Sequence, residues 1–184
     1  MSKLIQSDAE LDDLLTTPTP ADIEFFRKLE GDLIILGVGG KIGPCLARRA
    51  GRAAQAAAAK IRIIGTDVHC EDLDADRFEA AEVEILCVDL LEPSSFATLP
   101  DAPNVIFMAG RKFGSTGNEN LTWAMNVHVP ALVAGRYRSS RIVVFSSGNI
   151  YPFLPVNTGG ATEETAPAPL GEYAQSVLGR ERMF

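Results

Sequence analysis

Cysteine and histidine are scarce in this 184-residue chain, which contains three cysteines and two histidines. Cys45, Cys70 and Cys87 are scattered along the chain, and no two of them have the C-x-x-C spacing. Cys45 and Cys87 lie among apolar residues and are interpreted as small core residues. His69 and His128 are isolated, so no metal site is expected. Scattered thiols and a polar N-terminus without a signal-peptide pattern predict a reduced, cytoplasmic protein.

Long apolar runs and excess positive charge are also missing. No apolar stretch approaches the roughly 20 residues of a membrane-spanning helix, so no membrane partner is expected. The chain has 17 basic and 24 acidic residues, and this net charge of −7 argues against a nucleic-acid partner. The short basic runs at Arg48–Arg49 and Arg136–Arg138 are interpreted as solvated helix faces. The hydrophobic content of 46% is enough for the buried core of one domain.

A glycine-rich turn follows the first strongly apolar run of the chain. Residues 32–38 lead directly into glycines spaced G-x-x-G-x-x-G, at Gly37, Gly40 and Gly43. This order of strand, turn and helix is typical of a dinucleotide-binding βαβ unit. Gly37 would make the tight turn, Gly40 would let a pyrophosphate approach the backbone, and Gly43 would let the helix pack closely on the strand. The residues predicted to line this turn are Gly37, Gly39, Gly40, Lys41, Ile42 and Gly43.

Two carboxylates are predicted to complete the cofactor site. Asp67 lies 24 residues after Gly43, at the end of the next apolar run, where it can accept hydrogen bonds from the adenosine ribose. Its charge would repel the extra phosphate of NADP, so NAD is favoured over NADP. Asp89 ends the third apolar run and, with Leu90, is predicted to lie at the adenine edge. For both aspartates an ordinary strand-end turn is the alternative interpretation.

Apolar runs and helical patterns alternate from Asp32 onward. We expect strands near 32–38, 61–66, 83–88, 104–109 and 141–146, and helices near 41–59, 70–80, 94–98 and 119–137. Nearly continuous Val, Ile, Leu and Phe content is typical of parallel strands buried on both faces. The predicted fold class is therefore α/β, with a doubly wound parallel sheet in a Rossmann-type, three-layer α/β/α arrangement.

Residues 1–30 predict an N-terminal helical extension ahead of this sheet. Ser7 and Glu10 have the spacing of a capping box, and Thr19 can cap a second helix that begins at Pro20. We therefore divide the chain into this extension and an NAD(P)-binding domain over residues 31–184.

The C-terminal part predicts a loop and then a last helix. Residues 152–171 are rich in Pro, Gly and Thr, and a helical pattern begins near Gly171. This pattern is expected to continue to Phe184, which suggests that the domain is truncated before its substrate-binding part.

Small and polar residues after the fourth strand fit the same cofactor site. Met108, Ala109 and Gly110 would allow the cofactor and the chain to approach closely. Asn126 is a polar residue inside an otherwise apolar helical pattern. Because buried polar groups need partners, we expect Asn126 to bridge backbone groups near the site.

Together these residues resemble those of the extended short-chain dehydrogenase/reductase superfamily, in particular its NAD-dependent epimerases and dehydratases. The resemblance covers about residues 32–181. It rests on Gly37, Gly40, Gly43, Asp67, Asp89, Asn126, the segment Ser146-Ser147-Gly-Asn-Ile-Tyr151, and Tyr173. It implies that Ser147 orients the substrate oxygen and that Tyr173 exchanges a proton while the nicotinamide exchanges hydride. A sugar or nucleotide-sugar substrate and a possible homodimer are implied in the same way.

Two departures from the family pattern stand out. The family motif is Tyr-x-x-x-Lys, but the chain has Val177 where the lysine belongs. That lysine holds the nicotinamide ribose, and its charge favours the phenolate form of the tyrosine. Arg180 lies seven residues after Tyr173, about two helical turns away, and is expected to be a poor substitute. Gly148 and Asn149 replace the Asp-Glu pair of 4,6-dehydratases, so water elimination of that kind is not expected.

Three functions therefore remain open. The first is an epimerase-like or dehydratase-like oxidoreductase that uses NAD. The second is a non-catalytic dinucleotide-binding or redox-sensing protein that has lost the lysine of the motif. The third is a simple reductase of a small carbonyl compound. Retention of Ser147 and Tyr173 favours an enzyme, whereas Val177 favours a binding protein.

Overall fold

Residues 4–184 are described by a computed structural model, and their contacts group them into two units. The first unit contains the described residues up to Asp89 together with Pro100–Met108 and Ser139–Ile142. The second contains Leu90–Leu99, Ala109–Arg138 and Val143–Phe184. Residues 1–3 of the predicted N-terminal extension lie outside the described part.

A five-stranded sheet has the order β3-β2-β1-β4-β5. Its strands are β1 (Leu33–Leu36), β2 (Ile63–Asp67), β3 (Val83–Cys87), β4 (Asn104–Phe107) and β5 (Arg141–Val144). The pairs β1–β2, β1–β4 and β2–β3 are parallel. The chain crosses over after β3, so that β1 lies between β2 and β4. Ligands bind at such a reversal of strand order, beyond the carboxyl ends of the strands.

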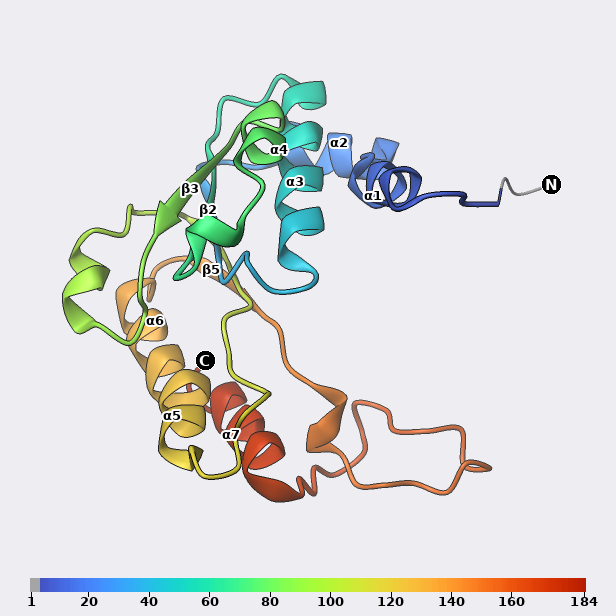
Figure 1. The fold of residues 1–184 in the computed structure, drawn as a ribbon, viewed down its shortest axis with the longest axis vertical. Coiled ribbons are helices and arrows are strands. Elements are labelled where there is room, and N and C mark those ends of the chain that lie inside the picture. Colours follow the sequence, from blue (N-terminus) through green and yellow to red (C-terminus); the bar gives the residue numbers. More distant parts are fainter. Residues whose placement is uncertain (1–3) are drawn as a thin grey trace. The chain divides into compact units, whose positions relative to one another are not determined.

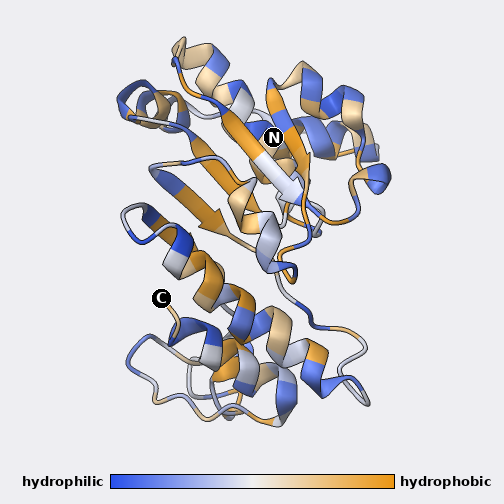
Figure 2. Ribbon diagram, turned by 90° about the vertical axis from the view of Figure 1, so that its left-hand side faces the viewer, coloured by the Kyte–Doolittle hydropathy of each residue, from blue (hydrophilic) through white to orange (hydrophobic). Residues whose placement is uncertain are grey.

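The central strands β1, β2 and β4 are largely buried, and Figure 2 shows their apolar colour, whereas most residues of β3 and all residues of β5 are exposed or half-buried. All four residues of β1 are buried, and Ile34, Ile35 and Leu36 have no exposed surface. On one side of the sheet, α3 (Gly43–Ala57) contributes Ala47, Ala50, Ala53 and Ala54 to the core. Small alanine side chains let this helix lie close to the strands. The fold-class prediction of a Rossmann-type α/β sheet is confirmed.

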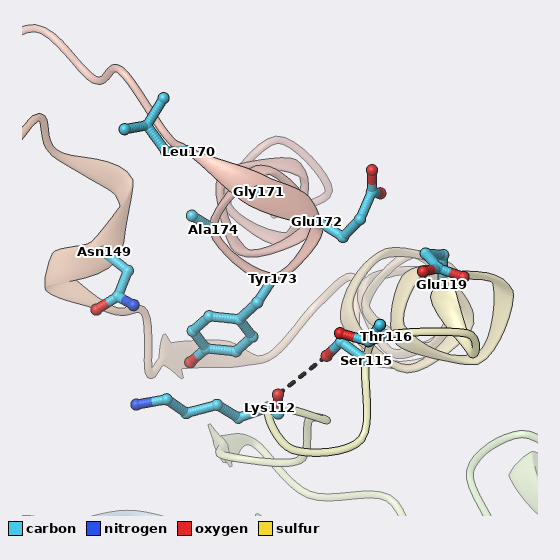
Figure 3. A pocket seen from close by; sticks show the side chains of 10 residues that line it. All are labelled: Lys112, Ser115, Thr116, Glu119, Asn149, Leu170, Gly171, Glu172, Tyr173 and Ala174. Carbon is cyan, nitrogen blue, oxygen red and sulfur yellow. Dashed lines mark hydrogen bonds between the residues drawn. The ribbon is translucent and has the colours of Figure 1, made fainter.

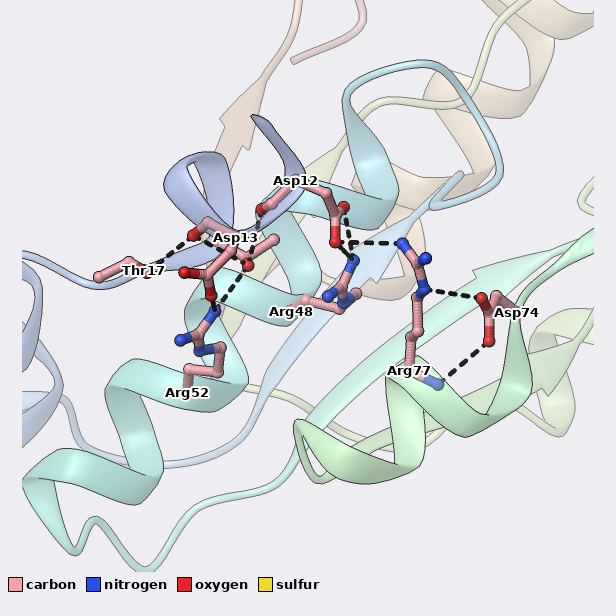
Figure 4. Close-up of polar contacts among 8 residues, drawn as sticks. Asp12, Asp13, Thr17, Arg48, Arg52, Asp74 and Arg77 are labelled. Carbon is pink, nitrogen blue, oxygen red and sulfur yellow. Dashed lines mark hydrogen bonds and ion pairs between the residues drawn. The ribbon is translucent and has the colours of Figure 1, made fainter. Parts of the chain in front are cut away.

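Two N-terminal helices, α1 (Asp8–Thr16) and α2 (Pro20–Lys28), pack against α3 (Figure 1). Ser7 and Thr19 cap them, as predicted, and Thr19 forms a capping box with Asp22. Several ion pairs join the carboxylates of these two helices to arginines of α3 and of α4 (Ala75–Ala80). Figure 4 shows the carboxylates of α1 pointing toward arginines of α3 and α4. The ion pairs and their N–O distances are Asp12–Arg48 at 2.7 Å, Asp13–Arg52 at 3.0 Å, Asp22–Arg49 at 2.6 Å and Asp12–Arg77 at 3.1 Å.

These pairs correct the interpretation of the basic runs as solvated helix faces. Arg48 and Arg49 bind carboxylates of the N-terminal helices. In the second unit, Arg136 donates to the carbonyl oxygens of Phe96 and Leu99, at 3.3 and 2.7 Å. These contacts could not be predicted from the sequence, because the hydrogen-bond partners of the arginines lie far away along the chain.

A disulfide joins Cys70 to Cys87 and corrects the expectation of unpaired thiols. The register of β2 with β3 places Asp67 beside Cys87, and a 3₁₀ turn at Cys70–Asp72 keeps the chain near that strand end. The two Cα atoms are therefore 5.7 Å apart despite 17 residues of separation. Cys87 is exposed rather than part of the core, whereas Cys45 is half-buried with a free thiol.

The helices that follow β2 and β3 are shorter than predicted. The region expected to be one helix over 70–80 is the 3₁₀ turn followed by α4 (Ala75–Ala80), and residues Pro93–Ala97 form the 3₁₀ helix η2.

The helix expected over 119–137 has three parts. These are α5 (Glu119–Trp123), a π-helical turn η3 (Ala124–His128) and α6 (Val129–Arg136). The last helix, α7 (Gly171–Glu181), ends before Phe184, so the expectation that it continues to the last residue is wrong. No helix of residues 4–184 is long and apolar enough to cross a membrane.

Candidate functional site

The glycine turn of the first unit has the geometry that the spacing predicts. Gly37 has a φ of +93°, a conformation that favours glycine, and its N–H donates to the carbonyl of Thr66 at 2.9 Å. A Cβ atom on Gly43 would lie 2.2 Å from the carbonyl oxygen of Val38. A Cβ on Gly40 would lie 3.9 Å from its nearest neighbour. The turn is therefore tightly packed at Gly43 and open at Gly40, where a pyrophosphate needs space.

Asp67, at the end of β2, closes the turn from the other side. Its carboxylate accepts N–H bonds from Gly39 at 2.7 Å and from His69 at 3.1 Å. A Cβ on Gly39 would lie 2.6 Å from the carboxyl carbon, so a larger residue there would displace the Asp67 side chain. A carboxylate has about four lone-pair sites, so these two bonds leave room for ribose hydroxyls. Glycine turn and aspartate therefore fit the adenosine half of a dinucleotide.

The other predicted cofactor residues are distributed over both units. In the first unit, Asp89 follows β3, and the Met108 N–H donates to the carbonyl of Leu36 at 2.9 Å. Lys41 and Ile42 are exposed in the turn itself. In the second unit, the Leu90 side chain is buried, and Ala109 precedes Gly110 in the segment after β4.

Asn126 lies in the π-helical turn and has no exposed surface. Its Oδ1 accepts the Arg111 N–H, and its Nδ2 donates to the Arg111 carbonyl, both at 2.9 Å. Nδ2 also donates to Ser176 Oγ at 2.9 Å. The prediction that Asn126 bridges backbone groups is confirmed. It fastens the segment after β4 to helix α7.

Arg180 is a buried member of the same network that the sequence interpretation undervalued. Its Nη2 donates to Asn126 Oδ1 at 2.8 Å, and its Nη1 donates to the Phe145 carbonyl at 2.9 Å. Burial lowers the pKa of Arg180, and the nearby Tyr173 opposes that shift. A Cβ on Gly110 would lie 2.1 Å from Arg180 Nη2, which explains the glycine there. Helical spacing places Tyr173, Ser176 and Arg180 on one face of α7, but it does not indicate which residues of other segments Arg180 contacts.

Tyr173 lines a pocket of about 280 Å³ within the second unit (Figure 3). The polar side chains around it come from the segment after β4, from the start of α5, from the turn after β5 and from the start of α7. The lining residues are Lys112, Ser115, Thr116, Glu119, Asn149, Leu170, Gly171, Glu172, Tyr173 and Ala174. Val177 is one turn further along α7 and has no exposed surface. The side chain at the lysine position of the motif therefore packs in the interior.

Ser147 lies in the turn that follows β5. It is the N-cap of the 3₁₀ helix η4 (Gly148–Ile150), and its Oγ accepts the Asn149 N–H at 3.2 Å. Asn149, two residues further, lines the Tyr173 pocket. The turn that contains Ser147 and the helix that contains Tyr173 therefore belong to the same unit. The catalytic roles of Ser147 and Tyr173 stay predictions.

His69 is less isolated than its sequence position indicates. Ligand atoms of His69, Glu71 and Asp72 lie within 4.8 Å of one another on the surface. Exposed acidic groups often gather in this way without an ion.

Comparisons with known proteins support the fold. No protein-family profile and no curated protein match the sequence. Among solved structures, a predicted epimerase from Burkholderia cenocepacia is 27% identical, with a TM-score of 0.64 over 84% of this chain and 49% of that protein.

Two further structures were solved in complex with NAD. A dTDP-glucose 4,6-dehydratase from Bacillus anthracis is 16% identical, with a TM-score of 0.67 over 84% of this chain and 49% of its own. A UDP-glucuronic acid 4-epimerase from Bacillus cereus, also bound to UDP-glucuronic acid, is 17% identical, with a TM-score of 0.66 over 83% and 50%. The chain spans about half the length of each of the three proteins. The chain therefore shares the Rossmann-type fold of these structures, as expected from its resemblance to the extended short-chain dehydrogenase/reductase superfamily.

Proposed function

We propose that this chain is the NAD-binding part of an oxidoreductase similar to nucleotide-sugar epimerases and dehydratases. The observation that carries the proposal is the glycine turn closed by Asp67, with an open position at Gly40. The NAD complexes of the similar B. anthracis and B. cereus proteins support the choice of cofactor. Their substrates, a dTDP-sugar and a UDP-sugar, support a sugar or nucleotide-sugar as substrate class.

The chemistry would be reversible oxidation of a hydroxyl-bearing carbon. Bound NAD would supply the hydride acceptor. Tyr173 would take the hydroxyl proton as the carbon–hydrogen bond breaks and the carbonyl forms, and it would return that proton in the reverse step. Ser147 would hold the substrate oxygen by a hydrogen bond. Gly148 and Asn149 offer no acid–base pair for water elimination, which favours epimerase-like over dehydratase-like chemistry.

Calorimetric titration with NAD and NADP tests the cofactor proposal. We expect NAD to bind at least about tenfold more tightly than NADP, because the Asp67 carboxylate repels the additional phosphate. Asp67→Asn keeps an acceptor for the Gly39 N–H but removes the charge, so it should reduce this preference. Equal or tighter binding of NADP by the wild type would show that Asp67 does not select the cofactor.

Gly40→Val provides the matched test of the turn. The added side chain points into the open space where the pyrophosphate would lie, so NAD binding should be lost while circular dichroism stays that of the wild type. Retained binding would contradict the proposed position of the cofactor.

A second candidate function is non-catalytic dinucleotide binding. The buried Val177 favours it, because no ammonium group lies at that position of the motif. Conversion of UDP-glucuronic acid, UDP-glucose or dTDP-glucose to a new sugar nucleotide during incubation with NAD would favour the enzyme. The conversion is followed by NMR spectroscopy, because an epimerase returns the hydride to its substrate and accumulates no NADH. NAD binding without turnover of a broader set of sugars and small alcohols would favour the binding protein. The homodimer and the cytoplasmic location stay predictions.

A further inference from the structure

Lys112 places an ammonium group next to Tyr173. Its Nζ lies 5.6 Å from the centre of the Tyr173 ring and 5.7 Å from the centre of the Phe113 ring. Both distances are within the range of a cation–π contact. Lys112 forms no ion pair with any residue in 4–184. The ammonium group therefore makes cation–π contacts with two aromatic rings, and no carboxylate of the described residues neutralises its charge.

The position of the Lys112 ammonium group within the pocket can be followed in Figure 3. Figure 3 shows Lys112 running along the Tyr173 ring, with its ammonium group at the same end as the phenol oxygen and facing the side of Asn149. The two acidic residues of the pocket are engaged elsewhere. Glu119 accepts the Gly117 N–H at 2.9 Å, and Glu172 accepts the Trp123 indole N–H at 2.6 Å. The hydroxyl end of Tyr173 is thus the cationic end of the pocket.

Arg180 is also a cation near Tyr173, but its guanidinium group donates hydrogen bonds to other residues. It braces Asn126 and the Phe145 carbonyl, and it is not one of the residues that line the pocket. Val177 supplies no charge. Lys112 is therefore the cation that shares the pocket with Tyr173.

We propose that Lys112 supplies, beside Tyr173, the positive charge that the lysine of the Tyr-x-x-x-Lys motif supplies in similar proteins. This inference rests on the proposed function. During alcohol oxidation the hydroxyl proton passes to the Tyr173 phenolate while hydride leaves the carbon, so the phenolate must exist beforehand. A nearby ammonium favours the charged form of a phenol. Lys112 acts through Tyr173 as a positioning residue, and it comes from a different element than the motif lysine.

A spectroscopic titration tests the inference without cofactor or substrate. The near-ultraviolet phenolate absorbance is followed against pH, and the Tyr173→Phe variant identifies the signal of Tyr173 among the three tyrosines. In Lys112→Gln we expect this signal to appear at a higher pH than in the wild type, because the favourable charge is lost. Lys112→Arg should restore wild-type behaviour, and Lys60→Gln, an exposed lysine outside the pocket, should change nothing.

Charged groups that face Tyr173 from other positions need separate control. They are Glu119, Glu172 and Arg180. Added salt screens exposed charges, so it should move the wild-type signal toward that of Lys112→Gln and affect the variant much less. If the phenolate absorbance of Lys112→Gln appeared at the same pH as that of the wild type, the inference would be wrong. That outcome is distinguishable from failure of the proposed function, which would appear as absence of NAD binding by the wild type.

Discussion

Gly43 and Gly40 belong to one turn but have different surroundings. Gly43 faces the Val38 carbonyl, which belongs to the backbone and cannot move aside easily, whereas Gly40 faces open space. We expect Gly43→Ala to lower the free energy of unfolding by about 1–3 kcal/mol, the usual range for an overpacked site. Urea unfolding followed by circular dichroism measures the difference.

Gly40→Ala is the matched control for that prediction. The added methyl group has no close neighbour, so the free energy of unfolding should change by less than about 0.5 kcal/mol. If both variants were equally destabilised, the loss would reflect a general intolerance of the turn rather than packing at Gly43.

The roles of single residues could be predicted only where the backbone imposes them. The glycine spacing predicts a tight turn at Gly37 and close packing at Gly43, and both are found. The position of Arg180 beside Gly110 and Asn126 could not be predicted. That contact joins three separate segments, and neither helical nor strand periodicity contains information about it.

At the scale of elements, α1 is held on α3 by the pair Asp12–Arg48. The side chains are only 24% and 13% exposed. The hydrogen bond from Arg48 holds the pKa of Asp12 below its usual value, and the charges of Arg48, Arg77 and Arg52 act in the same direction. A lowered folded-state pKa means that the stabilisation is fully present above the unfolded-state pKa, near 3.9, and is lost as the pH falls from there through the lower folded-state pKa.

Asp12→Ala should therefore destabilise the protein more at pH 7 than at pH 3. We expect a loss of about 1 kcal/mol at pH 7 for this partly exposed pair. Urea unfolding at the two pH values gives the comparison. Glu24→Ala, which removes exposed pairs to Arg27 and Lys28, is the control and should have a smaller effect. An equal loss at both pH values would indicate that packing, and not charge, explains the effect of Asp12→Ala.

Helices and strands could be predicted best where the hydrophobic pattern of the sequence is regular. The five strands and the long helix α3 are where their apolar patterns place them. The helix predicted over 119–137 contains a π turn at Asn126, whose side chain bonds to Arg111 and Ser176. The helix predicted over 70–80 begins instead as a 3₁₀ turn at Cys70–Asp72, where Cys70 is bonded to Cys87. Both departures lie where a side chain contacts a residue far away along the chain.

At the scale of the whole molecule, the proposed cofactor should stabilise the folded chain. A ligand that binds only the folded state adds about 2.7 kcal/mol when its concentration is 100 times its dissociation constant. Thermal unfolding should accordingly occur at a higher temperature as NAD is added, and less so with NADP. In Gly40→Val the shift should vanish. A shift of the same size in that variant would mean that NAD binds outside the glycine turn.

The sequence by itself determined the elements whose causes are local. Alternating apolar and amphipathic segments specify a parallel α/β sheet, and the spacing Gly37–Gly40–Gly43 followed by Asp67 specifies the turn of a dinucleotide site. Only the tertiary structure decided which side chains share a pocket with Tyr173. Lys112 lies 61 positions before Tyr173 in the chain, and the cation–π contact between them arises because the segment after β4 and the start of α7 line the same pocket. Such contacts depend on how separate elements pack, and packing is a property of the folded chain rather than of any sequence window.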